Sequence, residues 1–388
     1  MRALPQDLHH QRDERIVVIA RQLAAEGAGI TVEDDYDAIN QLYLERGWTD
    51  GLPIVPPTAT RIAAMLAYCD QAEDGSYAEV APRYGAATPL RVAANAVMAG
   101  CRPEYFPIIV LALQCMAEKQ FNSYGLQTTT HPGAPLIIVN GPIAREIGLN
   151  AAQNVFGPGT HANATIGRAI SLCLRNIGGA IPGSTDMATF GTPAKYTYCV
   201  AENEAASPWA PLHVELGFAA DTSTVTVAAA EAPHNVNDHQ SLTGEGVLKM
   251  IAGTLSTTGS NDIYYTKTSQ PIVAFGPEHA ALVAASGFSK ADVKRFLFEH
   301  AHMPMNRFSD EHIEHRLRRN FPERYANAPD DAPVPMFQAP ELLMLLVLGG
   351  VGKHSMVIPS FGITTHVTRA LTLPDGRLAR SIEDFRRI

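Results

Sequence analysis

The 388-residue sequence predicts an α/β fold: a mixed or parallel sheet with flanking helices, in one large unit or two interleaved domains. Three observations support this prediction. Short apolar runs end at glycine or proline turns and lead into helical segments, which is typical of βα units. One stretch, residues 166–177, places apolar side chains on a single helical face. The apolar content of 46% is sufficient for a large buried core.

The N-terminal part, residues 1–58, is predicted to contain helices followed by a proline-rich loop. Residues 16–25 and 34–46 have helical spacing, and Gly27 and Gly47 lie where helices would end. The run GWTDGLPIVPPT at residues 47–58 contains three prolines and an Asp-Gly pair, which exclude a continuous helix. Trp48 and Asp50 on this loop form either a pocket wall or an anchor for the N-terminal helices.

The main α/β body is predicted over residues 59–327. Helical spacing is found in residues 60–68, 90–98, 106–116, 143–147, 166–177, 278–285 and 290–319. Strand candidates are residues 135–139, 195–201, 222–228 and 271–275. Residues 106–116 are apolar on nearly all sides, so that helix should be buried. Ser289 and Asp292 resemble a capping box.

Residues 328–388 are predicted as a proline-rich linker and a C-terminal strand segment, residues 342–348, that completes the sheet. This last apolar run ends at Gly349-Gly350, as two earlier runs end at Asn140-Gly141-Pro142 and Gly276-Pro277. In α/β sheets ligands bind beyond the carboxyl ends of strands. We therefore expect the three turns on one edge, with Lys353 and His354 facing the segment from Thr128 to Glu215.

The composition of the chain argues against some classes of binding partner. The formal charge is −9 and basic residues do not cluster, so we expect neither nucleic acid nor an anionic membrane as a partner. The most apolar runs are far shorter than the roughly 20 residues of a membrane span, and the N-terminus lacks a secretory signal pattern. Five dispersed cysteines indicate reduced thiols. We expect a cytoplasmic homo-oligomer.

Polar residues lie among glycines and prolines between Thr128 and Glu215, a mixture expected of functional loops. General acid-base chemistry is assigned to Asp186, Glu202 and His213. The substrate-binding candidates are Trp48, Asp50, Thr129, Thr130, Asn140, His161, Asn163, Lys353, His354 and Ser355. His161 lies in a first helical turn, where it either contacts a ligand or is a solvated neighbour of the cap. Cys199, near Glu202 and His213, is either a reactive thiol or a packed one.

Histidines and carboxylates also allow a divalent metal, with His131, His213 and Glu215 as candidate ligands. His213 and Glu215 would share one face of a strand, and His234 and His239 could straddle a turn. None of these spacings is a recognised zinc signature, and the alternative is a polar cleft. The turn at residues 349–355 lacks the Walker A pattern, and residues 157–159 lack a dinucleotide fingerprint, so no nucleotide cofactor is expected.

The run at residues 47–58 resembles that of a little-characterised family of bacterial proteins. The resemblance spans roughly residues 44–370, and its other motifs are TTHP (129–132), VNGP (139–142), NATIGR (163–168), TDMA (185–188), AENE (201–204), SPW (207–209), PLH (211–213) and HS (354–355). Such proteins are sometimes associated with UGSC-type selenoproteins, which are similar to part of the glycine and betaine reductases. No cysteine here precedes Gly-Ser-Cys. The resemblance therefore implies that any redox-active residue belongs to another polypeptide.

The leading hypothesis is an enzyme of lyase or hydrolase type. It would act on a small polar or anionic substrate by acid-base chemistry, with metal assistance if a divalent ion is bound. The alternative is a substrate-binding subunit of a two-component thiol- or selenol-dependent reductase, with a small thiol or selenol protein as its partner.

Overall fold

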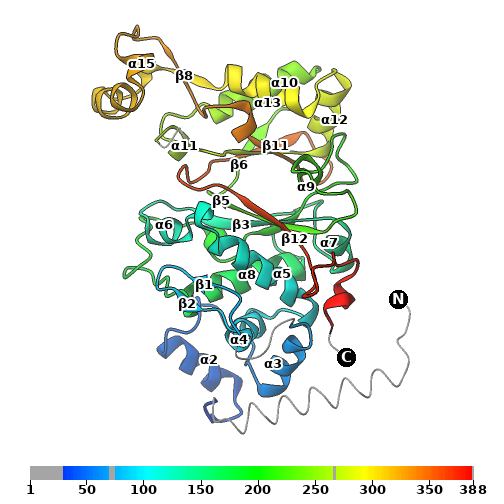
Figure 1. The fold of residues 1–388 in the computed structure, drawn as a ribbon. Coiled ribbons are helices and arrows are strands. Elements are labelled where there is room, and N and C mark those ends of the chain that lie inside the picture. Colours follow the sequence, from blue (N-terminus) through cyan, green and yellow to red (C-terminus); the bar gives the residue numbers. More distant parts are fainter. Residues whose placement is uncertain (1–28, 70–74, 265–267, 387–388) are drawn as a thin grey trace.

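The computed structural model describes residues 29–69, 75–264 and 268–386, and these residues form four layers (Figure 1). A helical layer covers one sheet, a second sheet packs on the first, and a second helical layer closes the other side. Both sheets contain parallel and antiparallel pairs, so the predicted α/β class with a mixed sheet is confirmed. The helix predicted at residues 16–25, with Gly27 at its end, lies outside the described residues.

The first sheet has the strand order β12-β5-β3-β4. Its strands are β3 (Ala134–Asn140), β4 (Cys199–Ala201), β5 (Thr224–Ala230) and β12 (Val367–Ala370). β3 is parallel to β4 and antiparallel to β5, which is antiparallel to β12. All seven residues of β3 are buried because both faces of the sheet are covered, which explains the continuous apolar run in the sequence.

The second sheet has the strand order β10-β7-β11-β6. Its strands are β6 (His234–Asn237), β7 (Ile272–Phe275), β10 (Met344–Val347) and β11 (His354–Ile358). β7 and β10 are parallel, and β11 is antiparallel to both β7 and β6. The C-terminal part of the chain thus supplies strands to both sheets.

Side chains alternate between the two sides of each strand, and this alternation builds the layers. Ile137 and Val139 of β3 face the first helical layer, whereas Leu136 and Ile138 pack with Leu346 of the second sheet. The first layer contains α3 (Ala59–Leu66), α4 (Pro89–Ala99), α5 (Phe106–Ala117) and α8 (His161–Asn176). The second contains α10 (Gly244–Leu255), α12 (Pro277–Ala285) and α13 (Lys290–His300).

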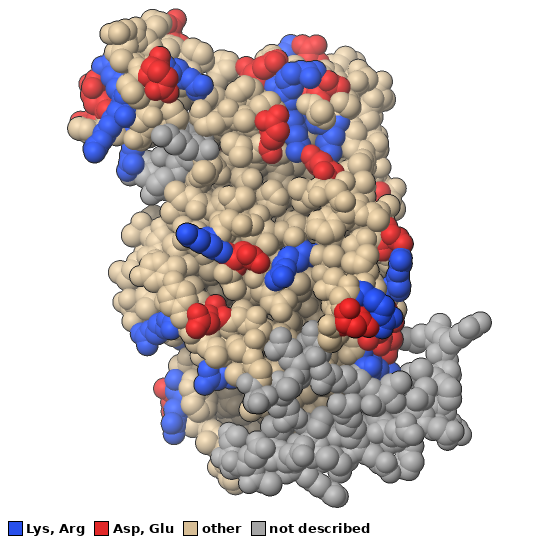
Figure 2. Space-filling view, viewed as in Figure 1, with Lys and Arg blue, Asp and Glu red and all other residues tan. Residues whose placement is uncertain are grey.

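The remaining α-helices and strands of the described residues lie around these layers. They are α2 (Tyr36–Glu45), β1 (Glu79–Val80), β2 (Gly85–Ala86), α6 (Ser123–Thr128), α7 (Pro142–Glu146), α9 (Leu212–Glu215), α11 (Asn261–Tyr264), β8 (His302–Pro304), α14 (Asp310–His312), α15 (Pro322–Tyr325) and β9 (Pro333–Pro335). The capping box of Ser289 and Asp292 is present at the start of α13, as predicted. Figure 2 shows acidic and basic side chains beside one another on one face, most densely over the upper helical layer.

Two local predictions are wrong. Residues 195–201 form a strand only from Cys199, because Pro193–Lys195 form a 3-10 turn. Residues 290–319, predicted as helical, are interrupted by a strand at residues 302–304. The glycine turn after residues 342–348 reverses the chain, so that β11 runs antiparallel to β7. The three glycine turns lie close together at the carboxyl ends of β3, β7 and β10, although these strands belong to two sheets and not to one. Gly141 bonds Glu204, the neighbouring Asn203 bonds Gly349, and the backbone of Leu348 bonds that of Phe275, next to Gly276.

Candidate functional site

The predicted catalytic residues fall into two groups at opposite ends of the parallel pair β3 and β4. Asn140 ends β3 and Glu202 follows β4, so both lie at the carboxyl ends. Asp186 instead lines a pocket with Gly133 and Pro135 at the amino end of β3. A seven-residue strand is about 20 Å long. The structure therefore does not bring Asp186 together with Glu202 and His213, and a small substrate cannot contact all three.

Asn140, Glu202, Glu204 and His213 form a group that we call the carboxyl-end cluster. Glu202 Oε2 accepts hydrogen bonds from Asn140 Nδ2 at 2.7 Å and from the backbone N–H of Leu212 at 2.8 Å. Glu204 Oε1 accepts a hydrogen bond from Asn140 Nδ2 at 3.1 Å and lies 3.9 Å from His213 Nδ1. Burial raises the pKa of Glu202 despite its hydrogen bonds, so its neutral form is favoured.

Most of the carboxyl-end cluster is closed to solvent, and only Glu204, which is paired with Arg145, is partly exposed. Asn140 and His213 have exposed fractions of 0%. Within the described part of the chain, Asn140 Oδ1, His213 Nδ1 and Thr224 Oγ1 are buried without a hydrogen-bond partner. Asn140 and Thr224 are direct partners across β3 and β5. The cluster is thus a polar part of the interior and not an open pocket.

An open pocket of about 540 Å³ lies at the amino end of β3, and we call it the amino-end pocket. Asp186 accepts hydrogen bonds from Lys195 Nζ through both carboxylate oxygens, at 2.8 and 2.7 Å. Asp50 is held at 2.8 Å by both Nε and Nη2 of Arg168. Burial opposes ionisation of Asp50, but Arg168 outweighs it and the pKa of Asp50 is lowered. Both carboxylates are therefore neutralised by a cation.

Arg175 is the remaining charged group that lines the amino-end pocket. Its Nε donates a hydrogen bond to the backbone carbonyl of Gly47 at 3.2 Å. Among the described residues, no carboxylate is paired with its guanidinium. The pocket therefore carries one cation in excess of its ion pairs, and this cation belongs to the side chain best suited to bind a carboxylate.

The rest of the amino-end pocket is mostly apolar. Its walls include Pro135, Leu174, Ala180, Ala188, Pro193 and Tyr196. Phe190, on the loop that follows Asp186, is 95% exposed at the pocket. This loop is attached to the body by the backbone bond from Thr189 N–H to Thr130 O, 2.9 Å. Thr130 thus supports the pocket through its main chain.

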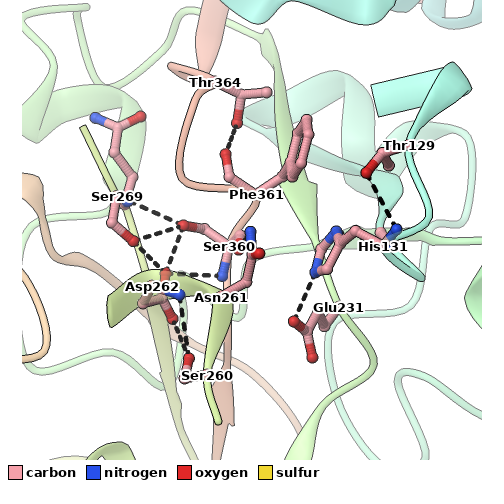
Figure 3. A network of polar contacts seen from close by, with 12 residues as sticks. Thr129, His131, Glu231, Ser260, Asn261, Asp262, Ser269, Ser360, Phe361 and Thr364 are labelled. Atoms are coloured by element: carbon pink, nitrogen blue, oxygen red, sulfur yellow. Dashed lines mark hydrogen bonds and ion pairs between the residues drawn. The ribbon is translucent and has the colours of Figure 1, made fainter. Parts of the chain in front are cut away.

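His131 lies beside a polar network that joins distant segments (Figure 3). Its Nε2 is 2.6 Å from Glu231 Oε1, and its Nδ1 accepts the Gly133 N–H at 3.2 Å. Thr129 Oγ1 accepts the backbone N–H of His131 at 3.1 Å. Since both ring nitrogens are engaged, His131 and Thr129 fix the entry to β3.

The remaining loop and helix candidates have structural contacts. Trp48 packs edge-on against Tyr43 of α2, and its carbonyl accepts a hydrogen bond from Asn176 at 2.9 Å, which favours the anchor interpretation. His161 is exposed beside Tyr105. Asn163 exchanges two hydrogen bonds with the backbone of Asn150, at 2.8 and 3.0 Å. These contacts place none of the three side chains in the amino-end pocket.

A second small pocket of about 170 Å³, the glycine-turn pocket, is lined by the turn at residues 349–352, His354 and the loop containing Gln153 and Phe156. His354 therefore does face the segment from Thr128 to Glu215. Lys353 does not, because its Nζ lies 3.4 Å from the carbonyl of His239. Ser355 is buried and its Oγ is 2.9 Å from His279 Nδ1.

The predicted metal ligands His131, His213 and Glu215 are not brought together. His131 is paired with Glu231, and Glu215 is paired with Lys290 at 2.7 Å. Residues 212–215 form helix α9 and not a strand, so side chains two positions apart point in different directions. Across the described ranges, no group of three or more His, Cys, Asp or Glu side chains is placed to hold a metal ion.

The cysteine thiols are structural. Cys69, Cys115, Cys173 and Cys199 are buried, and Cys101 is partly buried. Burial raises the pKa of Cys101 and Cys115 to about 12, and it also raises the pKa of Cys173 and Cys199. A thiol held neutral is a weak nucleophile, so the packed alternative applies to Cys199.

Three cations near the amino-end pocket were missed as site residues: Arg168, Arg175 and Lys195. A signal for two of them was present. Arg168 and Arg175 are seven residues apart on α8, which is two helical turns, so they share one face. A pair of arginines on one face of an amphipathic helix could have indicated an anion site. Lys195 carried no comparable signal.

Comparison of the chain with family models, curated proteins and solved structures gives no match. Function is therefore inferred from the geometry of the two ends of β3. Within the described residues, no helix is long and apolar enough to cross a membrane.

Proposed function

We propose that the chain is an enzyme that binds a small substrate with a carboxylate and an apolar portion in the amino-end pocket. The observation that supports this is the charge of the pocket. Asp50 and Asp186 are each neutralised by a cation, and Arg175 remains available for an anionic ligand. The apolar walls fit the rest of such a substrate.

The reaction that we propose is of lyase or hydrolase type, with Asp186 and Lys195 as the acid-base pair. Lys195 Nζ lies within 2.8 Å of both carboxylate oxygens of Asp186, so a proton donor and a proton acceptor stand side by side in one pocket. A substrate carboxylate on Arg175 would fix the orientation of the reacting carbon relative to this pair. In this proposal Glu202 and His213 have a structural role at the other end of β3 and β4.

Replacement of Arg175 by Ala should lower the affinity for the ligand at least 10-fold. A charge-assisted bidentate hydrogen bond contributes about 1.5 to 3 kcal/mol, which corresponds to a factor of roughly 10 or more. Calorimetric titration with short-chain and aromatic carboxylates, each compared with its amide, measures this effect. Arg377→Ala is the matched control, because the Arg377 side chain is 75% exposed and paired with Asp375 in a C-terminal turn. Equal affinities in wild type and Arg175→Ala would refute the assigned pocket.

Asp186→Asn should keep the ligand affinity within a few-fold and reduce kcat about 100-fold, since proton transfer by a positioned carboxylate contributes about this much. Carboxylates that bind are incubated with wild type and variant, and product is followed by mass spectrometry. Wild-type turnover that the variant retains in full would remove Asp186 from the mechanism.

The second candidate is a substrate-binding subunit of a thiol- or selenol-dependent reductase. The buried, neutral thiols of this chain support it, because redox chemistry would need a reactive group from another polypeptide. In the same experiment, this function predicts carboxylate binding through Arg175 without turnover, and turnover only after a small thiol or selenol protein is added.

A further inference from the structure

Two exposed histidines face each other at the rim of the glycine-turn pocket. His354 is the first residue of β11, and His239 follows β6, the strand that pairs with β11. Their Nε2 atoms are 3.4 Å apart. The two residues are 115 positions apart in the sequence, so only the pairing of β6 with β11 brings them together.

The tautomer of His354 is set by the hydrogen bond that its Nδ1 atom makes. Nδ1 of His354 donates a hydrogen bond to Asn235 Oδ1 at 3.0 Å. A neutral imidazole that carries its proton on Nδ1 has its lone pair on Nε2. The lone pair of His354 therefore points toward His239. In histidines that bind metals, the ring nitrogen that does not bind the ion commonly donates a hydrogen bond to an oxygen, such as that of an amide or a carboxylate, and this bond orients the ring.

The spacing of the rings fits a shared ion better than a direct hydrogen bond. Hydrogen bonds of an N–H group have donor-acceptor distances of about 2.7–3.2 Å, which is shorter than the 3.4 Å observed. Two imidazoles bound to one tetrahedral ion at roughly 2.05 Å would have nitrogens about 3.3 Å apart and ring centroids about 5.2 Å apart. The observed centroid separation is 5.2 Å. We propose that His239 and His354 bind one divalent transition-metal ion, of the class of Zn²⁺ or Co²⁺.

The surroundings leave the remaining coordination positions open. Lys353 is the nearby cation, with its Nζ at the His239 carbonyl. Two carboxyl groups lie on neighbouring residues: Glu278 Oε1 accepts the Gly352 N–H at 3.1 Å, and Asp238, next to His239 in the chain, is buried. Because His354 also lines the glycine-turn pocket, a small anion in that pocket could complete the coordination. The site is separate from the amino-end pocket, so this proposal does not depend on the proposed function.

Calorimetric titration of the full chain with Zn²⁺, and visible absorption with Co²⁺, tests the site. We expect His239→Ala and His354→Ala each to lower the affinity of one ion per chain at least 10-fold and to remove the tetrahedral Co²⁺ bands. His234→Ala is the matched control, since His234 is an exposed histidine at the start of β6, and it should bind as wild type does. Asn235→Ala should weaken binding less than either ligand variant.

Circular dichroism confirms that each variant is folded before titration. The site is disproved if the wild-type chain binds no ion. It is equally disproved if both ligand variants keep the wild-type stoichiometry and affinity, because binding would then arise from other histidines of the chain.

Discussion

Gly141→Ala is expected to lower the free energy of unfolding by about 3 to 4 kcal/mol. Gly141 has φ +88° and ψ −173°, a region essentially restricted to glycine that costs an L-residue about 1–3 kcal/mol. A Cβ at this position would also lie 2.5 Å from the carbonyl oxygen of Thr222 and 2.7 Å from Ser223 Cα. Both neighbours are backbone atoms, so overpacking adds a further penalty of about 1–3 kcal/mol. The Gly141 N–H also donates a hydrogen bond to Glu204 Oε1 at 2.6 Å, so a shift here disturbs the carboxyl-end cluster.

Gly148→Ala measures the cost of a positive φ without the steric clash of the added Cβ. Gly148 has φ +72°, but no atom lies within 4 Å of the position of its added Cβ. We expect a loss of about 1 kcal/mol, from the backbone conformation alone. Urea unfolding followed by circular dichroism measures both variants. If they lose the same stability, the close approach of Gly141 to Thr222 does not constrain the turn.

The strands and helices that the sequence predicts best are those with a strong local pattern. β3 is recognisable because its apolar run is continuous, and α8 because its apolar residues recur at spacings of three and four. The pairing of two separate sheets through the side chains of Leu136 and Ile138 is a long-range property, and no periodicity within one segment encodes it. The sequence therefore predicts the class of fold without its four-layer arrangement.

The grouping of site residues by sequence proximity fails for a physical reason. Asp186 is only 16 positions before Glu202, but β4 lies between them and carries the chain from the amino to the carboxyl end of β3. Glu202 and His213 are brought together because the loop after β4 turns back, so that the Leu212 N–H reaches Glu202. His213 and Glu215 were assigned to a strand on a spacing of two, yet four residues are too few to distinguish that pattern from the short helix α9.

Asp262→Ala is expected to destabilise the fold by about 4 kcal/mol at pH 5. Asp262, fully enclosed on α11, accepts hydrogen bonds from the Ser360 N–H at 3.1 Å, from Ser360 Oγ at 2.6 Å and from Ser269 Oγ (Figure 3). Alanine would leave these donors buried without an acceptor, at about 1–3 kcal/mol each. The network also links α11 to the segment after β11, where Ser360 bridges Ala230 of the first sheet. Denaturant unfolding measures the loss.

Asp262→Asn is the matched variant. Because Asn does not ionise, the difference in stability between this variant and the wild type should depend on pH. Its amide oxygen could accept from Ser360 and its NH₂ could donate to Ser260, so we expect a change below about 1 kcal/mol at pH 5. Burial raises the pKa of Asp262 from 3.8 to about 6 against the opposing hydrogen bonds. A raised carboxyl pKa means that the contribution of this group to stability is complete below pH 3.8 and is lost as the pH rises through 6.

The wild-type chain should therefore lose up to about 3 kcal/mol relative to Asp262→Asn between pH 4 and pH 8, since each unit of pKa shift corresponds to about 1.4 kcal/mol. Unfolding curves of both proteins across this range give the difference directly. The opposite sign, with wild type gaining on the Asn variant as the pH rises, would mean that the surrounding hydroxyl and N–H donors stabilise the carboxylate more than burial penalises it. Asp262 would then be an ionised group that joins the two halves of the fold, rather than a carboxyl group that is protonated under mildly acidic conditions.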